Sequence, residues 1–107
     1  MILRILQLDI ENPKSHDMIY MDYDRIKNQF DLSNYSIIYE DKNFSHINPL
    51  TNEQFDESTT KLLDYIFTIF NIGKKPETYK GHSLSVSDII ELDGVMYYVD
   101  GFGFVNL

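Results

Sequence analysis

GHSLSVSDIIELDGVMYYVDGFGFVNL, running from Gly81 to the last residue, Leu107, is the stretch that decides the fold. Two segments rich in β-branched and aromatic residues, 81–92 and 95–107, flank the dipeptide Asp93-Gly94. Asp-Gly between two such segments favours a two-residue type I′ turn, because both turn positions need a positive φ. The sequence therefore predicts a β-hairpin at the C-terminal end of the chain.

The predicted turn also sets the register of this hairpin. With the dipeptide at the tip, we expect Leu92 to lie opposite Val95. Ile90 then lies opposite Tyr97. Two glycines in the segment 101–103 predict a bend or bulge before a last short β run.

Two strands and two helices are predicted before the hairpin. Residues 2–8 and 35–39 are apolar and β-rich, which is typical of strands. Asp22 is placed to cap a short helix that runs to about Phe30. The strongest helix signal covers residues 56–73, because it opens with two acids and stops at a glycine. Its apolar stripe contains Leu62, Leu63, Ile66, Phe67, Ile69 and Phe70.

These elements predict an α+β fold, a small and mostly antiparallel sheet with a C-terminal β-hairpin and about two packed helices. A length of 107 residues favours one domain, residues 1–107. The polar segment 40–55 is the best candidate for a mobile loop. The oligomeric state stays open, although an exposed hairpin edge is able to pair with another strand.

The amino-acid composition excludes cysteine chemistry, and the N-terminal segment bears on the location of the protein. The chain has no cysteine, which excludes disulfides, thiol nucleophiles and thiolate metal sites. The first apolar run is interrupted by Arg4 and Gln7, so it predicts a buried strand and neither a signal peptide nor a membrane span. We therefore expect a cytoplasmic protein that does not contact the membrane.

The formal net charge of −8 argues against a broad nucleic-acid-binding surface, because phosphate contacts need Lys and Arg. The only basic cluster is formed by Lys74, Lys75 and Lys80. Three lysines make a small footprint, so direct nucleic-acid binding is unlikely but stays open through these residues.

The C-terminal stretch carries acids but neither Lys nor Arg. An acidic surface attracts a basic partner and speeds their encounter, whereas the simpler interpretation is that these acids keep a small protein soluble. An exposed tyrosine beside acids adds contact area to such a surface. The candidate partner-binding residues are Asp88, Glu91, Asp93, Asp100, Tyr97 and Tyr98.

Catalytic and metal signals are weak. His16, His46 and His82 lack the spacing of a zinc site and are expected on the surface or in loops, so we expect no metal and no cofactor. Alternation in a strand would place the hydroxyls of Ser83, Ser85 and Ser87 on one face, without a Gly-x-Ser-x-Gly elbow. No catalytic residue is therefore predicted. A small hydrolase or nuclease that uses His82 stays open as a function, ranked below the two binding functions that are given at the end of this section.

Several motifs resemble the YodL-like domain. The most specific are GHSLSVSD at 81–88 and YYVDGFGF at 97–104. Weaker similarities upstream are LQLD at 6–9, MDYDR at 21–25, YSIIY at 35–39, LDYIF at 63–67 and FNI at 70–72. The resemblance covers nearly the whole chain and implies a protein of Firmicutes, often encoded on plasmids and conjugative elements.

This resemblance supplies no catalytic residues, so it implies a binding protein and no enzyme. Because mobile elements carry small acidic proteins that disable host defences, we expect an inhibitor of a defence nuclease. The first choice is an anti-CRISPR protein that acts on a type II Cas9 or its guide-RNA assembly, and a restriction enzyme is the second. The alternative is a regulatory adaptor that binds a host cell-shape or division protein.

Overall fold

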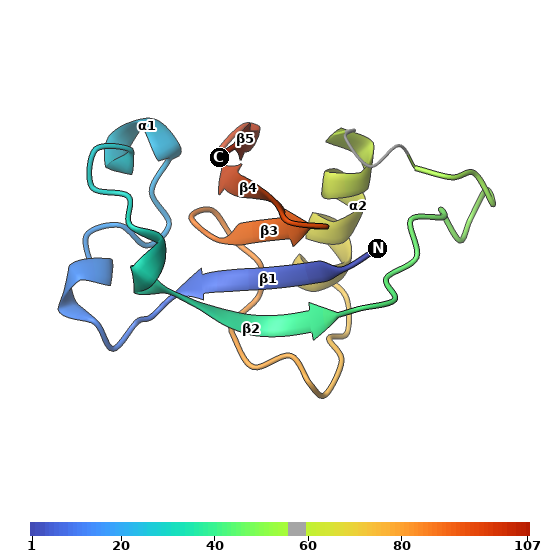
Figure 1. The fold of residues 1–107 in the computed structure, drawn as a ribbon, viewed down its shortest axis with the longest axis horizontal. Helices are drawn as coiled ribbons and strands as arrows, with labels where there is room; N and C mark the ends of the chain where they lie inside the picture. Colours follow the sequence, from blue (N-terminus) through green and yellow to red (C-terminus); the bar gives the residue numbers. More distant parts are fainter. Residues whose placement is uncertain (56–59) are drawn as a thin grey trace.

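The computed structural model describes residues 1–55 and 60–107. A five-stranded sheet with the strand order β2-β1-β3-β4-β5 organises the chain (Figure 1). Its strands are β1 (Leu3–Leu8), β2 (Tyr35–Asp41), β3 (Ile89–Leu92), β4 (Val95–Asp100) and β5 (Gly103–Asn106). All neighbouring strands are antiparallel, and β1 lies between β2 and the C-terminal hairpin. The predicted α+β class with a C-terminal hairpin is confirmed.

The hairpin has the predicted register. Leu92 pairs with Val95, and Ile90 pairs with Tyr97. Asp93 has a φ of 46° and the following glycine has a φ of 88°, as a type I′ turn requires. A second tight turn then joins β4 to β5, where the sequence predicted a bend.

Strand β3 begins only at Ile89, so the prediction of a strand from Gly81 onward is wrong. The carboxylate of Asp88 accepts the N–H of Ser85 at 2.8 Å. The N–H of Asp88 in turn donates to the carbonyl of Ser85 at 3.1 Å. These two bonds close a turn, because the short side chain of Asp competes with strand pairing for the local backbone.

Ser87 completes this turn with a φ of 86°. Its N–H donates to the carbonyl of Val99, whose own N–H donates to the carbonyl of Asp88. The arrangement resembles a G1 bulge, in which a residue with positive φ precedes the paired strand. Ser87 is therefore fully buried, whereas Ser83 and Ser85 are half-buried, and the three hydroxyls do not share a strand face.

Two α-helices flank the sheet, α1 (Tyr23–Ile26) and α2 (Thr60–Asn71), with short 3-10 turns at Pro13–Ser15 and Leu32–Asn34. Helix α1 ends four residues before the predicted limit, at Ile26 instead of Phe30. The predicted acidic start of the second helix, at 56 and 57, lies outside the described residues. In the described part of the chain, no helix is both long and apolar enough to span a bilayer.

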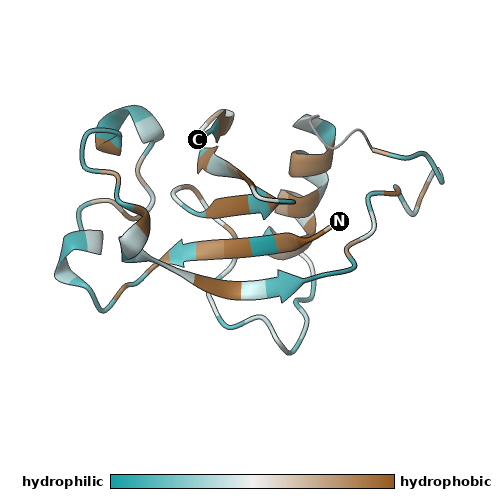
Figure 2. Ribbon diagram, viewed as in Figure 1, coloured by the Kyte–Doolittle hydropathy of each residue, from teal (hydrophilic) through white to brown (hydrophobic). Residues whose placement is uncertain are grey.

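The alternation of β1 and β4 separates two hydrophobic cores, one on each face of the sheet. On one face, Leu3 and Ile5 pack with the apolar stripe of α2. On the other face, Leu6 packs with Ile26 of α1 and with Tyr98. Figure 2 shows the apolar colouring concentrated on the strands and α2, whereas the segment around α1 is largely hydrophilic. The sheet therefore carries a large core on one face and a small, partly polar one on the other.

Candidate functional site

Half of the predicted partner-binding residues are inaccessible. The exposed fraction is 1% for Asp88, 6% for Glu91 and 0% for Tyr98. Asp88 ends the turn before β3, and Tyr98 points into the small core, where its hydroxyl donates to the carbonyl of Met21 at 2.6 Å. These three side chains do not form a contact surface, which corrects that part of the prediction.

Glu91 is buried because it pairs across the sheet with Arg4. Nη1 of Arg4 donates to Oε2 of Glu91 at 2.7 Å, and its Nε donates to Oε2 of Glu40 at 2.6 Å. The hydrogen bond from Arg4 lowers the pKa of the exposed Glu40 carboxyl. Glu91 therefore has a structural partner inside its own chain.

The other three predicted residues are accessible but lie at different places. Asp93 is exposed at the β3–β4 turn and accepts the N–H of Ile2 at 2.7 Å. Asp100 is half-buried at the other end of β4 and accepts the N–H of Tyr23 at 3.0 Å. Tyr97 is half-buried on the α2 face. The six residues therefore do not make one patch.

Asp88 belongs to a buried polar cluster that the sequence did not reveal. Nε2 of Gln7, on β1, donates to Oδ2 of Asp88 at 3.0 Å and to the carbonyl of His82 at 2.8 Å. Tyr79 also donates to the carbonyl of His82, at 2.7 Å. Because Gln7 and Asp88 are 81 residues apart, no local pattern in the sequence points to this pair.

Asp88 is a buried carboxyl group with a raised pKa. Burial raises the pKa of Asp88 to about 8, although hydrogen bonds from Ser85 and Gln7 lower it in part. Both of those bonds use Oδ2, which leaves Oδ1 without a donor. Oδ1 lies 3.8 Å from Nε2 of His82, and neither atom has a hydrogen-bond partner among the described residues.

His82 turns one ring nitrogen to the local backbone and the other to Asp88. Its Nδ1 lies 2.7 Å from the carbonyl oxygen of Ser83, so we assign a ring proton to Nδ1. Nε2 is the nitrogen that faces Asp88. His82 was expected on the surface or in a loop, and it lies in the loop before β3 with most of its side chain covered.

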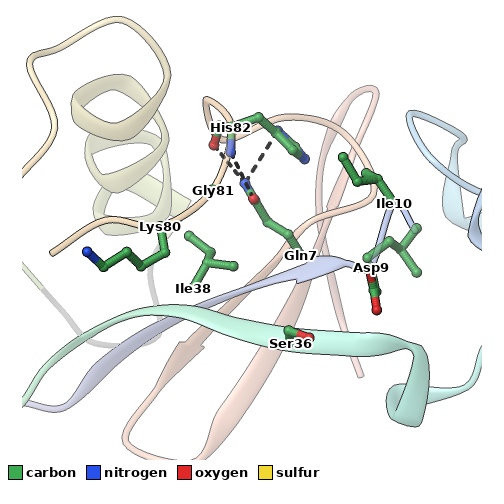
Figure 3. Close-up of a pocket in the computed structure, with 9 residues that line it drawn as sticks. Gln7, Asp9, Ile10, Ser36, Ile38, Lys80, Gly81 and His82 are labelled. Carbon is green, nitrogen blue, oxygen red and sulfur yellow. Dashed lines mark hydrogen bonds between the residues drawn. The ribbon is translucent and has the colours of Figure 1, made fainter. Parts of the chain in front are cut away.

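A pocket of about 380 Å³ opens beside this cluster, between the ends of β1 and β2 and the 80–82 segment (Figure 3). Gln7 rises from β1 towards His82, with Ile38 and Lys80 on one side of it. Asp9 and Ile10 lie on the other side. A Cβ on Gly81 would come within 2.0 Å of Oε1 of Gln7, so a residue with a side chain does not fit this close approach. The pocket combines apolar walls with one cation and one carboxylate, which suits small polar molecules of either charge.

His16 and His46 do not belong to this polar cluster. His16 contacts the carbonyl of Ile10, and His46 contacts Gln54. Among the described residues, no three His, Asp or Glu side chains are placed to hold a metal ion. Ser83 and Ser85 are hydrogen-bonded to each other, because Oγ of Ser85 donates to the carbonyl of Ser83.

The β4–β5 turn is the surface feature that sequence reasoning missed. Phe102 stands fully exposed at its tip. Asp22 binds this turn, because its Oδ1 accepts the N–H of Gly101 at 3.1 Å. Asp64 and Asp100 line a groove of about 190 Å³ beside the turn. The sequence Gly101-Phe102-Gly103-Phe104 predicts aromatic core packing with glycines at bends, and the full exposure of Phe102 corrects that prediction.

The chain belongs to the YodL-like domain family, which it matches over residues 2–107. None of the curated proteins and none of the solved structures matches it.

Proposed function

We propose that this chain is a non-enzymatic, cytoplasmic binding protein that inhibits a nucleic-acid-handling host enzyme by covering part of its basic surface. The observation that carries the proposal is the aromatic tip at the β4–β5 turn. Phe102 is fully exposed there, and the adjacent groove is lined by Asp64 and Asp100 but by no Lys or Arg. An exposed aromatic anchor with an acidic rim is the chemistry that a basic protein surface accepts.

A type II Cas9, or its assembly with guide RNA, is the first target that we propose, and a restriction enzyme is the second. Such enzymes hold nucleic acid in positively charged channels. A net charge of −8 on a chain of 107 residues favours association with these channels. Attraction of this kind weakens as salt rises, which separates it from a purely apolar contact.

The experiment is capture of purified type II Cas9, with and without guide RNA, by the tagged protein at low and at moderate salt. Two variants change the tip at exposed side chains without hydrogen bonds in the described structure, Phe102→Ser and Asp64→Lys. Glu77→Lys is the matched control, because it makes the same charge change on the connection beside β2, at the opposite edge of the sheet.

We expect salt-sensitive capture that each tip variant weakens by about tenfold and that Glu77→Lys reduces far less, because truncating a central anchor costs more than 1 kcal/mol. If all three variants lost capture of Cas9 equally, net charge alone would explain the loss. That result would contradict the tip as the contact. No capture of Cas9, together with a growth or shape defect in cells that lack CRISPR, would instead support the adaptor alternative. A hydrolytic activity that His82→Ala abolishes in a folded protein would overturn the non-enzymatic assignment.

A further inference from the structure

The two edges of the sheet differ, because the β2 edge is partly covered and the β5 edge is open. At β2, the carbonyl of Ile38 accepts the N–H of Lys80 at 2.9 Å, and a register shift interrupts its pairing with β1. The connection before Lys80 therefore covers part of that edge (Figure 1). At β5, the outer side has no partner strand in the described part of the chain. An open edge of this kind is a ready template for another strand.

The hydrogen bonds around β4 show which groups of β5 face outward. The N–H of Val99 donates to Asp88, on the β3 side, so Val99 and its register partner Phe104 form a non-hydrogen-bonded pair. At the other end, the N–H of Leu107 donates to the carbonyl of Met96. Hydrogen-bonded and non-hydrogen-bonded pairs alternate along an antiparallel ladder.

Phe104 and Asn106 consequently direct their N–H and C=O groups away from β4. Asn106 is the register partner of Tyr97, two residues along the ladder from Val99, and it therefore has the same orientation as Phe104. Neither amide has an acceptor among the described residues. The edge thus offers two amides and two carbonyls to an added strand.

The groove beside this edge sets the chemistry of the added strand. Its apolar lining comes from Phe67, Val86, Val99 and Phe104. Its acids are Asp64 of α2 and Asp100 of β4. Because side chains of a strand alternate, an added segment is able to direct apolar groups to the α2 face, where the groove lies, and basic groups to the opposite face, where Asp100 accepts the N–H of Tyr23.

We propose that the β5 edge, through Phe104 and Asn106, binds an extended basic segment of the partner as a sixth strand, with its apolar side chains on the α2 face beside the groove and its Lys or Arg side chains on the opposite face towards Asp100. The inference rests on the proposed function, since it names how the same tip region holds its target. A second copy of this chain is disfavoured, because two chains of charge −8 would bring the same acids together.

The test uses Asn106→Pro, with Asn106→Ala as its matched control. Asn106 is exposed, and proline removes the outward N–H without changing a bond to β4. The probe is a synthetic peptide of alternating Lys and Val, and a peptide of alternating Glu and Val controls for charge. Amide NMR shifts and hydrogen exchange of residues 103–107 are followed during titration.

We expect the Lys-Val peptide to protect the amides of Phe104 and Asn106, and the Asn106→Pro variant to bind it about tenfold more weakly than Asn106→Ala. The Glu-Val peptide should not bind. Equal affinities of the two variants, or shifts centred on another element, would overturn the inference. Self-association of the free protein that Asn106→Pro abolishes would also overturn it and assign the edge to a second copy.

The same variants separate this inference from the proposed function. If wild-type protein captures Cas9 and both Asn106 variants do so equally, the edge inference fails while the proposed function stands. If the peptide binds the edge but no nucleic-acid-handling enzyme is captured, the edge inference stands and the proposed function fails.

Discussion

Nε2 of His82 faces Oδ1 of Asp88 at 3.8 Å, and both atoms are buried. Neither atom has a hydrogen-bond partner among the described residues, and burial raises the pKa of Asp88 to about 8. The burial of Asp88 therefore makes the stability of the fold depend on pH.

Asp88 should destabilise the fold as the pH rises from about 5 to about 8. In this window the unfolded chain has lost the proton, whereas the folded chain keeps it, because burial raises the pKa of Asp88 to about 8. The free energy of unfolding then falls with pH by at most about 1.4 kcal/mol per unit. Above that pKa, Asp88 adds no further pH dependence.

Chemical denaturation of wild type and Asp88→Asn across this pH range checks the prediction. The free energy of unfolding of Asp88→Asn minus that of wild type should increase as the pH rises. Tyr35, Tyr79 and Tyr98 do not titrate in the window, since burial raises the pKa of each hydroxyl. His82→Gln in both backgrounds controls for the imidazole that faces Asp88. A pH-independent difference would show that Asp88 is ionised in the fold.

Gly81→Ala should destabilise the protein by about 1–3 kcal/mol, because the new Cβ displaces the amide of Gln7 from its buried partners. Lys80→Ala, at the exposed neighbour, should change stability by less than about 0.5 kcal/mol. In a double-mutant cycle, Gly81→Ala should cost much less in a Gln7→Ala background. Additive losses would mean that the two residues do not interact.

Tyr98→Phe should lower the free energy of unfolding by about 1–2 kcal/mol, because it leaves the carbonyl of Met21 without its donor. Tyr97→Phe is the matched control, since the Tyr97 hydroxyl has no hydrogen bond in the described structure. It should change stability by about 0.5 kcal/mol or less. Equal effects, measured by urea denaturation, would contradict the role assigned to the Tyr98 hydroxyl.

Ser87→Gly should be more stable than Ser87→Ala by about 1 kcal/mol, although glycine usually weakens a strand. Both variants lose the acceptor of the Tyr20 N–H, which is 2.9 Å from Oγ of Ser87. Only glycine relieves the φ of 86°. Thermal unfolding of the pair provides the measurement, and a more stable alanine variant would argue against the positive φ.

Much of the fold was predictable because its causes are local. Asp93-Gly94 specifies its turn through backbone conformation alone, and the register of the hairpin follows. The alternation of Tyr97 and Tyr98 between faces follows from strand geometry. The stripe of α2 likewise matches the core that it packs against.

The 81–88 segment was not predictable in the same way. Its alternating Ser, Leu and Val pattern is typical of a strand. The turn that replaces the strand depends on Asp88, whose carboxylate binds Ser85 while Gln7 binds it from β1. A pattern limited to neighbouring residues contains no information about Gln7.

The sequence alone therefore determined the hairpin, the composition of the sheet, the amphipathic helix and the family. Only the tertiary structure decided which acids are accessible: it buried Asp88 and Glu91 against Gln7 and Arg4, and it left Asp64 and Asp100 beside the exposed Phe102. The reason is physical, because turns and amphipathic periods arise from neighbours in the chain. Burial and ionisation depend on the segments that folding brings together.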